Sequence, residues 1–396
     1  MKDRKIATRS VRAGLESDAQ FGAVVPPIYL TSNFAFDGFR KQRSKYDYTR
    51  SGNPTRDQLG AALADLEGGA GAVVTCTGLA GITLIVATLP SGSRVLMPHD
   101  CYGGTHRLLT ALHKQGVLVV DFVDQGNPQA LKAALAAKPR LVWIETPSNP
   151  LLRIVDIREL ATAAHAVGAT VVVDNTFLSP VWQQPLKLGA DLVLHSTTKY
   201  LNGHSDVVGG VVIAATAEQH QNLSWWANAI GVTGAPFDSF MTLRGVRTLH
   251  ARMRVHAENT VAVVDTLKLH TAVAQVYYPG LIDHPGHAIA RRQQSGFGAM
   301  LSFELRGGEP AVEAFLAGLE CFTLAESLGG VESLIAHPAT MTHAGMDEAS
   351  RIRAGIGPGL LRVSVGIEDP IDLVEDLNAA LARAGGIAAG TQLNPR

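Results

Sequence analysis

From residue 72 onward, the sequence alternates short, almost wholly apolar stretches with segments of helix length, and this alternation limits the fold more than any other feature. The seven apolar stretches cover residues 72–76, 94–97, 118–123, 141–145, 170–174, 192–195 and 210–214. Segments long enough for helices, such as residues 127–137 and 157–167, lie between them. Strands of this kind are buried on both faces, and helical connections join parallel strands. The alternation therefore predicts an α/β fold with a mostly parallel, seven-stranded sheet between helices.

The rest of the sequence divides into an arm before this alternating part and a smaller unit after it. Residues 1–62 show little periodicity, and an irregular arm of this length is unusual unless it packs on a partner or builds a site. A long helical pattern at 252–267 leads from the larger domain, residues 63–258, into residues 259–396. This last region has strand patterns at 300–305 and 361–365 and a helical pattern at 371–384, which predicts a smaller α+β C-terminal domain. Its Gly-rich end, about residues 385–396, is expected to be a loose tail.

Composition excludes several classes of protein. The 396 residues are 46% apolar and 17% charged, which suits a folded chain with a large core. The formal charge of −1 gives no electrostatic reason to expect nucleic acid or an acidic membrane surface as a partner. No apolar targeting segment follows the charged first residues, and the longest apolar run is too short to span a bilayer. The three cysteines are scattered without a CxxC pair, as is typical of a reducing compartment, so we expect a cytoplasmic protein.

The stretch HSTTKY, residues 195–200, places a lysine directly after an expected strand. A lysine that forms an imine must spend time unprotonated, and burial in an apolar site favours this by lowering its pKa. Ser196 and Thr198 carry hydroxyls that can donate hydrogen bonds to a phosphate. The stretch alone also fits an ordinary exposed lysine at the end of a strand. Lys199 is therefore a candidate catalytic residue that needs further support.

Two other stretches of the same region supply this support. Asp174 ends an apolar strand, where a carboxylate is costly to bury without a charged or donor partner. A protonated pyridine nitrogen is such a partner, and its ring then acts as an electron sink. Residues 75–81, TCTGLAG, predict a strand that turns through glycine into a helix, whose first N–H groups bind phosphate. A capping aspartate and a simple glycine turn are the ordinary alternatives, but the order of phosphate turn, aspartate and lysine favours a cofactor site.

Several longer motifs make the sequence resemble the pyridoxal-phosphate (PLP) enzymes of Cys/Met metabolism. They are YTRSGNPT at 48–55, DCYGG at 100–104, ETPSNP at 145–150, DNTF at 174–177, STTKYLNGH at 196–204 and AESLGG at 325–330. The likeness runs from about residue 8 to residue 384. It implies PLP as the cofactor and fold type I, the aspartate aminotransferase-like fold. It also implies a homotetramer of active dimers, in which the N-terminal arm contacts a neighbouring subunit.

The resemblance implies roles for individual residues at the cofactor. Lys199 would form the imine with PLP, Asp174 would pair with the pyridine nitrogen, and Tyr102 would stack on the ring. The residues implied to hold the phosphate are Gly78, Leu79, Ser196 and Thr198 of the same subunit, with Tyr48 and Arg50 of a neighbouring subunit. The catalytic residues implied are Lys199, Tyr102 and Tyr48.

The resemblance also implies a substrate site. Arg362 would clamp the substrate α-carboxylate in bidentate fashion. The other substrate-binding residues implied are Ser327, Asn149, Glu326, Arg107, Asn228 and Asp47. No metal is expected, because His284 and His287 lie in a Pro/Gly loop that more simply forms a surface turn than a zinc site.

Within the family, the details most resemble bacterial cystathionine γ-synthases. Gly104 stands where methionine γ-lyases carry a cysteine, Glu326 can attract a distal amino group of the substrate, and Arg107 suits a distal carboxylate. Ser51 points the other way, because some synthases carry a second arginine there and γ-lyases do not. The implied reaction is γ-replacement, in which O-succinyl-L-homoserine or another O-acylhomoserine and L-cysteine give L-cystathionine, with Lys199 relaying protons. The alternatives are a cystathionine γ-lyase and a family member that binds ligands without catalysis.

Overall fold

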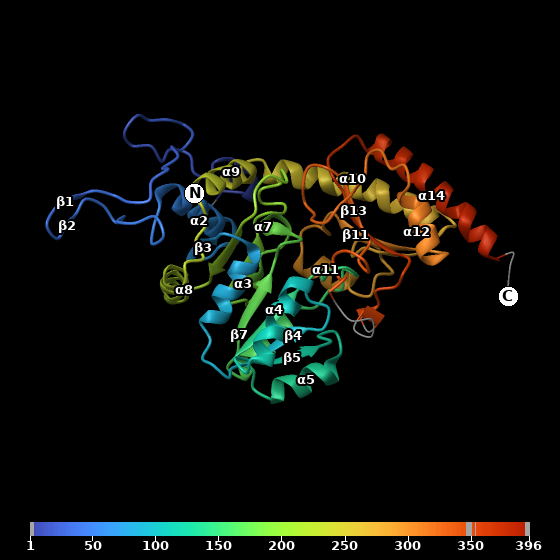
Figure 1. The fold of residues 1–396 in the computed structure, drawn as a ribbon, viewed down its shortest axis with the longest axis horizontal. Helices are drawn as coiled ribbons and strands as arrows, with labels where there is room; N and C mark the ends of the chain where they lie inside the picture. Colours follow the sequence, from blue (N-terminus) through green and yellow to red (C-terminus); the bar gives the residue numbers. More distant parts are fainter. Residues whose placement is uncertain (1–3, 346–350, 353, 393–396) are drawn as a thin grey trace.

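The largest sheet of the protein joins residues far apart in the sequence. Figure 1 shows it in the computed structural model, which describes residues 4–345, 351, 352 and 354–392. The helices are α1 (Ile6–Val11), α2 (Pro54–Glu67), α3 (Gly78–Ala87), α4 (Gly103–Lys114), α5 (Pro128–Ala136), α6 (Ile157–Ala166), α7 (Ser179–Trp182), α8 (Ala217–Ile230), α9 (Pro236–Val246), α10 (Leu249–Leu269), α11 (His287–Gln293), α12 (Gly308–Leu316) and α14 (Pro370–Gln392), with a 3₁₀ helix η1 (Pro185–Leu188). The strands are β1 (Phe36–Gly38), β2 (Lys41–Gln42), β3 (Gly71–Thr75), β4 (Arg94–Pro98), β5 (Val119–Val123), β6 (Leu141–Glu145), β7 (Thr170–Asp174), β8 (Leu192–Ser196), β9 (Gly210–Ala214), β10 (Val273–Tyr277), β11 (Met300–Leu305), β12 (Thr323–Leu324), β13 (Leu334–Ala336) and β14 (Leu360–Ser364).

The seven apolar stretches of the sequence form one seven-stranded sheet, so this prediction is confirmed. Its strand order is β3-β9-β8-β7-β6-β4-β5. Five adjacent strands run parallel to one another, namely β5, β4, β6, β7 and β8. Strand β9 runs antiparallel to both β8 and β3. The carboxyl ends of the parallel strands therefore meet along one edge, which is where ligands bind in open α/β sheets.

Alternate residues of each strand point to opposite faces of this sheet, and each face has its own core. On one face, Val171, Val173 and Val193 pack in a cluster with side chains of α2 and α6. On the other face, Val172 and Leu194 pack with side chains of α3, α4 and α8. Burial on both faces explains why the strands are apolar at successive positions rather than at alternate ones.

The helix α10 runs along the upper side of the molecule in the view of Figure 1, from beside α9 toward α12 and α14. Its first half packs on the larger core through Leu249 and Met253, and its second half packs on the C-terminal core through Val263 and Leu267. That second core packs against one face of a five-stranded sheet of order β10-β11-β14-β13-β12, in which only the β12–β13 pair is parallel. The helix thus holds the C-terminal sheet beside the carboxyl edge of the larger sheet.

The N-terminal arm extends away from the body and carries the small β1–β2 hairpin at its end (Figure 1). Phe21 and Phe39 on this arm are 82% and 89% exposed, although the arm is rich in apolar side chains. Its base is fixed by Arg56 of α2, whose Nη2 donates to the carbonyls of Thr49 (2.6 Å) and Arg50 (3.2 Å). An exposed apolar arm with an anchored base is the form expected of a segment that packs on another chain.

The C-terminal end differs from the expected loose tail. Helix α14 continues as far as Gln392, past the glycine pair at 385 and 386, and residues 393–396 lie outside the described residues. Alanines around this pair support helix propagation, which outweighs the modest cost of each glycine. Among the residues that the structure describes, no helix combines the length and the apolar character needed to cross a membrane.

Candidate active site

A cavity of about 880 Å³ opens at the carboxyl edge of the larger sheet and is closed on its other side by the C-terminal unit. Its walls come from the start of α3, from α4, from the loops after β6, β7 and β8, and from the C-terminal segments around residues 326 and 362. It brings together twelve of the residues singled out in the sequence: Gly78, Leu79, Tyr102, Arg107, Asn149, Asp174, Ser196, Thr198, Lys199, Glu326, Ser327 and Arg362.

Lys199 lies just past the end of β8, with its amine inside this cavity. The Nζ atom donates a hydrogen bond to Oγ of Ser327 at 2.6 Å. Burial and, to a smaller extent, the charge of Arg362 lower the pKa of Lys199 to about 8, and Glu326 opposes both. A substantial fraction of the amine is therefore neutral near pH 8, as a nucleophile or a proton acceptor requires.

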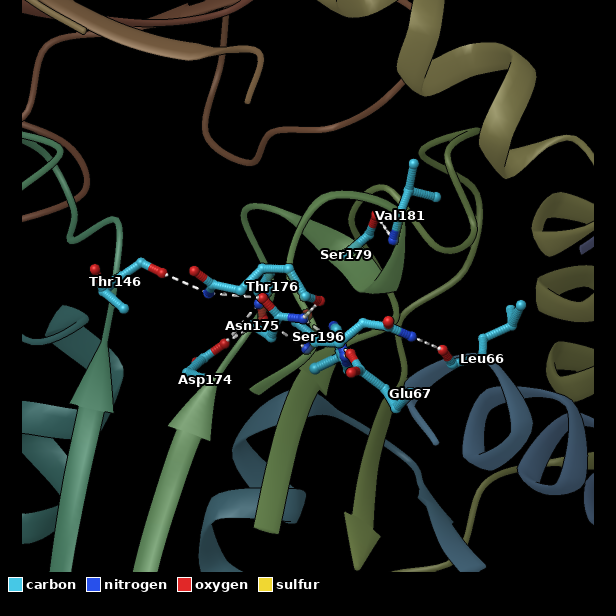
Figure 2. A network of polar contacts seen from close by, with 12 residues as sticks. Leu66, Glu67, Thr146, Asp174, Asn175, Thr176, Ser179, Val181 and Ser196 are labelled. Atoms are coloured by element: carbon cyan, nitrogen blue, oxygen red, sulfur yellow. Dashed lines mark hydrogen bonds and ion pairs between the residues drawn. The ribbon is translucent and has the colours of Figure 1, made fainter. Parts of the chain in front are cut away.

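Asp174 ends β7 and faces the same cavity. Its Oδ1 accepts hydrogen bonds from the main-chain nitrogen of Thr176 (3.0 Å) and from Oγ1 of Thr176 (2.5 Å). The Thr176 hydroxyl in turn accepts from the main-chain nitrogen of Ser196 at 2.9 Å (Figure 2). Burial raises the pKa of Asp174, whereas the hydrogen bonds from Thr176 lower it. Its carboxylate is thus held rigidly and would gain from a cationic partner.

A second buried carboxylate, Glu145, stands beside Asp174 at the end of the neighbouring strand β6. Its Oε2 accepts from the main-chain nitrogen of Tyr102 (2.9 Å), and its Oε1 accepts from Nε1 of Trp143 (3.1 Å). Burial and the adjacent Asp174 raise the pKa of Glu145 well above its usual range, which favours its neutral form. Glu145 therefore fixes the turn that carries Tyr102 into the cavity.

The start of α3 forms the part of the cavity suited to an anion. Thr77 caps the helix, because its Oγ1 accepts from the main-chain nitrogen of Ala80 at 2.8 Å. A Cβ atom at Gly78 would lie 2.9 Å from the Cβ of Ser196, so only glycine lets these two segments touch. The first N–H groups of a helix have no partner within the helix and attract negative charge. The hydroxyl of Thr198 lies nearby on the 196–199 turn and is hydrogen-bonded to the main chain of Gly209.

Arg362 reaches the cavity from β14 of the C-terminal sheet. Its Nη1 donates to Oδ1 of Asn149 (3.1 Å), and its Nη2 donates to the carbonyl of Ser327 (2.7 Å). Its Nε is buried and has no hydrogen-bond partner among the described residues. Burial lowers the pKa of Arg362 to about 10. A buried guanidinium with an unused donor is suited to a carboxylate ligand.

Four residues singled out in the sequence lie outside this cavity: Asp47, Tyr48, Arg50 and Asn228. They gather instead at the base of the arm, where Nε of Arg50 donates to Oδ1 of Asn228 at 3.0 Å. The guanidinium of Arg50 also lies 5.3 Å from the centre of the Tyr48 ring, and Asp47 accepts from Oγ of Ser51 at 2.6 Å. Within one chain, this arm cluster does not reach Lys199 and remains open to solvent.

Thr176 and Glu145 were not singled out in the sequence, although each contacts a residue that was. Thr176 lies in the motif DNTF just after a strand, and Glu145 begins the motif ETPSNP at the end of a strand. These positions were the sequence signal that could have identified them. Their partners could not be inferred from spacing, because Glu145 binds a main-chain nitrogen 43 residues earlier in the chain. His284 and His287 each bind a main-chain group of their own loop, His284 to Gly286 and His287 to Pro279.

Comparison with known proteins gives concordant results. A sequence model of the family described as Cys/Met metabolism PLP-dependent enzyme matches residues 7–382. Cystathionine γ-synthase of Escherichia coli is 59% identical over 375 residues, covering 94% of this chain and 97% of that protein. Cystathionine γ-lyase of Dictyostelium discoideum is 46% identical over 377 residues, covering 95% and 97%. The crystal structure of cystathionine γ-synthase from Xanthomonas oryzae pv. oryzae in complex with aminoacrylate and cysteine matches with a TM-score of 0.96 at 62% identity, covering 97% of this chain and 99% of that one.

Proposed function

The chain belongs to the Cys/Met metabolism PLP-dependent enzymes, and we propose that it joins an O-acyl-L-homoserine, in the first place O-succinyl-L-homoserine, with L-cysteine to give L-cystathionine. This is the γ-replacement of methionine biosynthesis by transsulfuration. The family, the PLP dependence and fold type I, all expected from the sequence, are confirmed by the family match and the solved relatives.

The cavity fits PLP in three respects. The carboxylate of Asp174, which burial destabilises as an anion, suits a protonated pyridine nitrogen. The start of α3, at Gly78 and Leu79, together with Ser196 and Thr198 suits the phosphate. The Lys199 amine lies in the same cavity as both. When bound, PLP supplies an aldehyde that condenses with an amine and a protonated ring that accepts an electron pair from the substrate Cα.

Lys199 is proposed to be the residue that moves protons. With the substrate amine held by the cofactor, the Lys199 amine would remove one proton from Cα and one from Cβ. After the acyl group has left Cγ and the cysteine sulfur has bonded there, it would return one proton to Cβ and one to Cα. Its pKa of about 8 suits both acceptance and donation near neutral pH. The hydroxyl of Ser327, 2.6 Å from Nζ, would hold the amine on one side of the substrate. Tyr102, 48% exposed at the cavity wall, is proposed to stack on the ring and to assist proton transfer.

The remaining cavity residues are proposed to bind the substrate. Arg362, braced by Asn149 and by the carbonyl of Ser327, would hold the α-carboxylate with its unused Nε and the outer edge of its guanidinium. Glu326 and Arg107 also line the cavity, where Glu326 suits a distal amino group and Arg107 suits a distal carboxylate. The positive and negative side chains of the cavity would thus orient a substrate that carries a charged group at each end.

The arm cluster is proposed to complete the site of a second subunit. Tyr48 and Arg50 would reach the PLP phosphate of the neighbour, and Asp47 and Asn228 would lie at its substrate. Two observations support this: all four lie outside their own cavity, and the arm exposes apolar side chains that need a cover. The assembly proposed is a homotetramer of two active dimers. A cytoplasmic location is also proposed, since all three cysteines are free thiols.

The proposed function depends most on one observation: the Lys199 amine, with its pKa lowered to about 8, shares a cavity with Arg362, whose Nε has no hydrogen-bond partner among the described residues. The test compares initial rates on O-succinyl-L-homoserine plus L-cysteine with rates on L-cystathionine alone. We expect γ-replacement to dominate, with 2-oxobutanoate formed more slowly when cysteine is left out. The second candidate is the γ-lyase that Ser51 suggests; faster cleavage of cystathionine than its synthesis would replace the synthase with that lyase.

A further inference from the structure

A buried pair of ionisable side chains, Glu67 and His195, lies directly beneath the proposed cofactor site. Glu67 is the last residue of α2 and His195 belongs to β8, and each side chain is 1% exposed. Nε2 of His195 lies 2.7 Å from Oε1 of Glu67. The same oxygen accepts from Nδ2 of Asn175 at 2.8 Å. Figure 2 shows Glu67 reaching from the end of its helix to the tips of the central strands.

This pair touches the two strands that carry the proposed cofactor residues. Asn175 directly follows Asp174, and His195 directly precedes Ser196. In the sheet, Asp174 pairs with Leu194, which lines the cavity. Because successive side chains of a strand point to opposite faces, His195 lies on the face of α2, one residue from the cavity face. The pair therefore lies on the face of the sheet opposite the cavity, where substrate cannot reach it. It is connected to Asp174 through the backbone of β7.

Burial bears on the charge of the pair. Oε1 of Glu67 accepts from Nδ2 of Asn175 and lies 2.7 Å from Nε2 of His195, whereas Oε2 of Glu67 and Nδ1 of His195 are buried without a hydrogen-bond partner among the described residues. A buried carboxylate beside a neutral imidazole would remain uncompensated at 1% exposure, whereas an imidazolium compensates it. Burial raises the pKa of the Asp174 carboxyl, whereas the hydrogen bonds from Thr176 and the charge of His195 lower it. A second ionisable group, Glu145 of β6, lies beside Asp174 in the sheet.

We propose that Glu67 keeps His195 positively charged and that this pair, from behind the sheet, holds Asp174 in its ionised form. Glu67 and His195 are thus positioning residues: they touch neither substrate nor cofactor and act through Asp174. The proposal depends on the role proposed above for Asp174 at the pyridine nitrogen. An ionised Asp174 keeps that nitrogen protonated, which in turn determines how readily the ring accepts electrons. This role would explain why the charges of Glu67 and His195 are kept in the protein interior, where burying a charge is unfavourable.

The test reads the protonation of the ring nitrogen directly. Holoenzyme is loaded with PLP labelled with nitrogen-15 in the ring, and its resonance is recorded by solid-state NMR in the wild type and in His195→Gln. The substitution keeps a donor toward Glu67 but removes the charge. We expect the resonance to shift from the protonated toward the unprotonated position, and Glu67→Gln to shift it in the same direction.

The matched control is His256→Gln. His256 is also fully buried and its Nδ1 bonds to the carbonyl of Val365 (2.7 Å), but burial lowers its pKa to about 4, and no carboxylate pairs with it among the described residues. It should leave the nitrogen resonance unchanged. An unchanged resonance in His195→Gln, or equal shifts in His195→Gln and His256→Gln, would overturn the proposal, because a merely structural pair gives one of these results.

A second measurement needs no variant and therefore remains decisive if the substitutions prevent folding. Neutron diffraction of deuterium-exchanged wild-type holoenzyme locates the deuterons on the His195 ring. Deuterons on both Nδ1 and Nε2 support the proposal, and a deuteron on one nitrogen alone overturns it. The failure of the proposed function looks different: wild-type protein would then bind no PLP, or would bind it with Asp174 away from the ring nitrogen.

Discussion

The amine of Lys199 lies 2.6 Å from Oγ of Ser327, and this hydrogen bond joins the larger α/β unit to the C-terminal unit inside the cavity. Ser327 has a φ of 87°, in the left-handed region that residues other than glycine seldom adopt. Its carbonyl accepts from Nη2 of Arg362 at 2.7 Å, which helps to hold the residue in this conformation. One serine thus positions both the proposed proton carrier and the proposed carboxylate ligand.

Replacement of this serine tests how far the position of Lys199 matters. Ser327→Ala removes the hydroxyl but keeps the main-chain carbonyl for Arg362, so the fold should persist. A hydrogen bond to a charged group contributes about 1.5–3 kcal/mol, and we therefore expect kcat to fall about 10- to 100-fold, with a smaller change in KM. Steady-state kinetics with O-succinyl-L-homoserine and cysteine measure this. The control is Ser295→Ala, which removes a hydroxyl bonded to the Val181 carbonyl outside the cavity and should leave kcat unchanged. A wild-type kcat in Ser327→Ala would show that the hydrogen bond between Lys199 and Ser327 has no catalytic role.

The lowered pKa of Lys199 predicts a pH dependence of cofactor uptake. Only the neutral amine attacks an aldehyde, so the rate at which stripped enzyme takes up PLP should rise with pH and level off above about 8, where Lys199 has lost its proton. Burial is the main cause of the lowered pKa, and the charge of Arg362 adds to it. Arg362→Gln should therefore raise the pKa of Lys199 and move the half-maximal rate to higher pH.

Stopped-flow absorbance in the visible range follows this uptake. The control is Arg306→Gln, which removes a cation bonded to the carbonyl of Thr271, far from the cavity. It should leave the profile in place. A profile that is flat between pH 6 and 10, or one that moves to lower pH in Arg362→Gln, would contradict the assignment of the titration to the Lys199 amine.

The sequence was sufficient for the parts of the fold that depend on local pattern. The strands at 141–145, 170–174 and 210–214 have the expected bounds, because burial on both faces leaves a continuous apolar signal. Asp174 and Lys199 were placed correctly at strand ends for the same reason. The helix beyond residue 384 was missed, since a glycine pair usually indicates a helix end, while here the preceding turns extend the helix through it.

Contacts between distant parts of the chain left no such signal. Glu67 and His195 are 128 residues apart, and each alone is compatible with a solvated side chain. Their pairing results from the order of the strands and from the point at which α2 ends, which periodicity does not encode. The residues of the arm cluster were inferred from the resemblance alone, because their proposed ligand belongs to another chain.

A complementation experiment tests the proposal that Arg50 serves a neighbouring subunit. Lys199→Ala should lose at least about 10³-fold in kcat while keeping its fold, because no other amine replaces it. Arg50→Ala should bind PLP about tenfold more weakly, the effect of one lost charged contact of about 1.4 kcal/mol. Arg43→Ala, on the same arm but paired with Asp37, is the control and should bind PLP normally.

Mixing these two variants then gives a decisive result. After joint unfolding and refolding at low PLP concentration, hybrid dimers contain one site with both native Lys199 and native Arg50, so activity should return above that of either variant alone. If Arg50 serves its own subunit instead, every site in the mixture lacks one of the two residues and no activity returns.

The last prediction concerns the acyl group of the substrate. Arg107 lines the cavity from the first turns of α4, and a free carboxylate on the acyl group would meet its guanidinium, whereas an acetyl group has no charge to offer. Arg107→Gln should therefore lower kcat/KM for O-succinyl-L-homoserine about 10- to 100-fold, as a lost charged hydrogen bond predicts, and change kcat/KM for O-acetyl-L-homoserine less than about threefold.

The control is Lys114→Gln, because Lys114 lines the same cavity from the last turn of the same helix. If the cavity selects by a general positive field, both variants reduce the preference for the succinyl ester equally; if Arg107 contacts the carboxylate directly, only Arg107→Gln does so. Equal loss with both esters in Arg107→Gln would mean that this arginine supports the fold of α4 and not the choice of substrate.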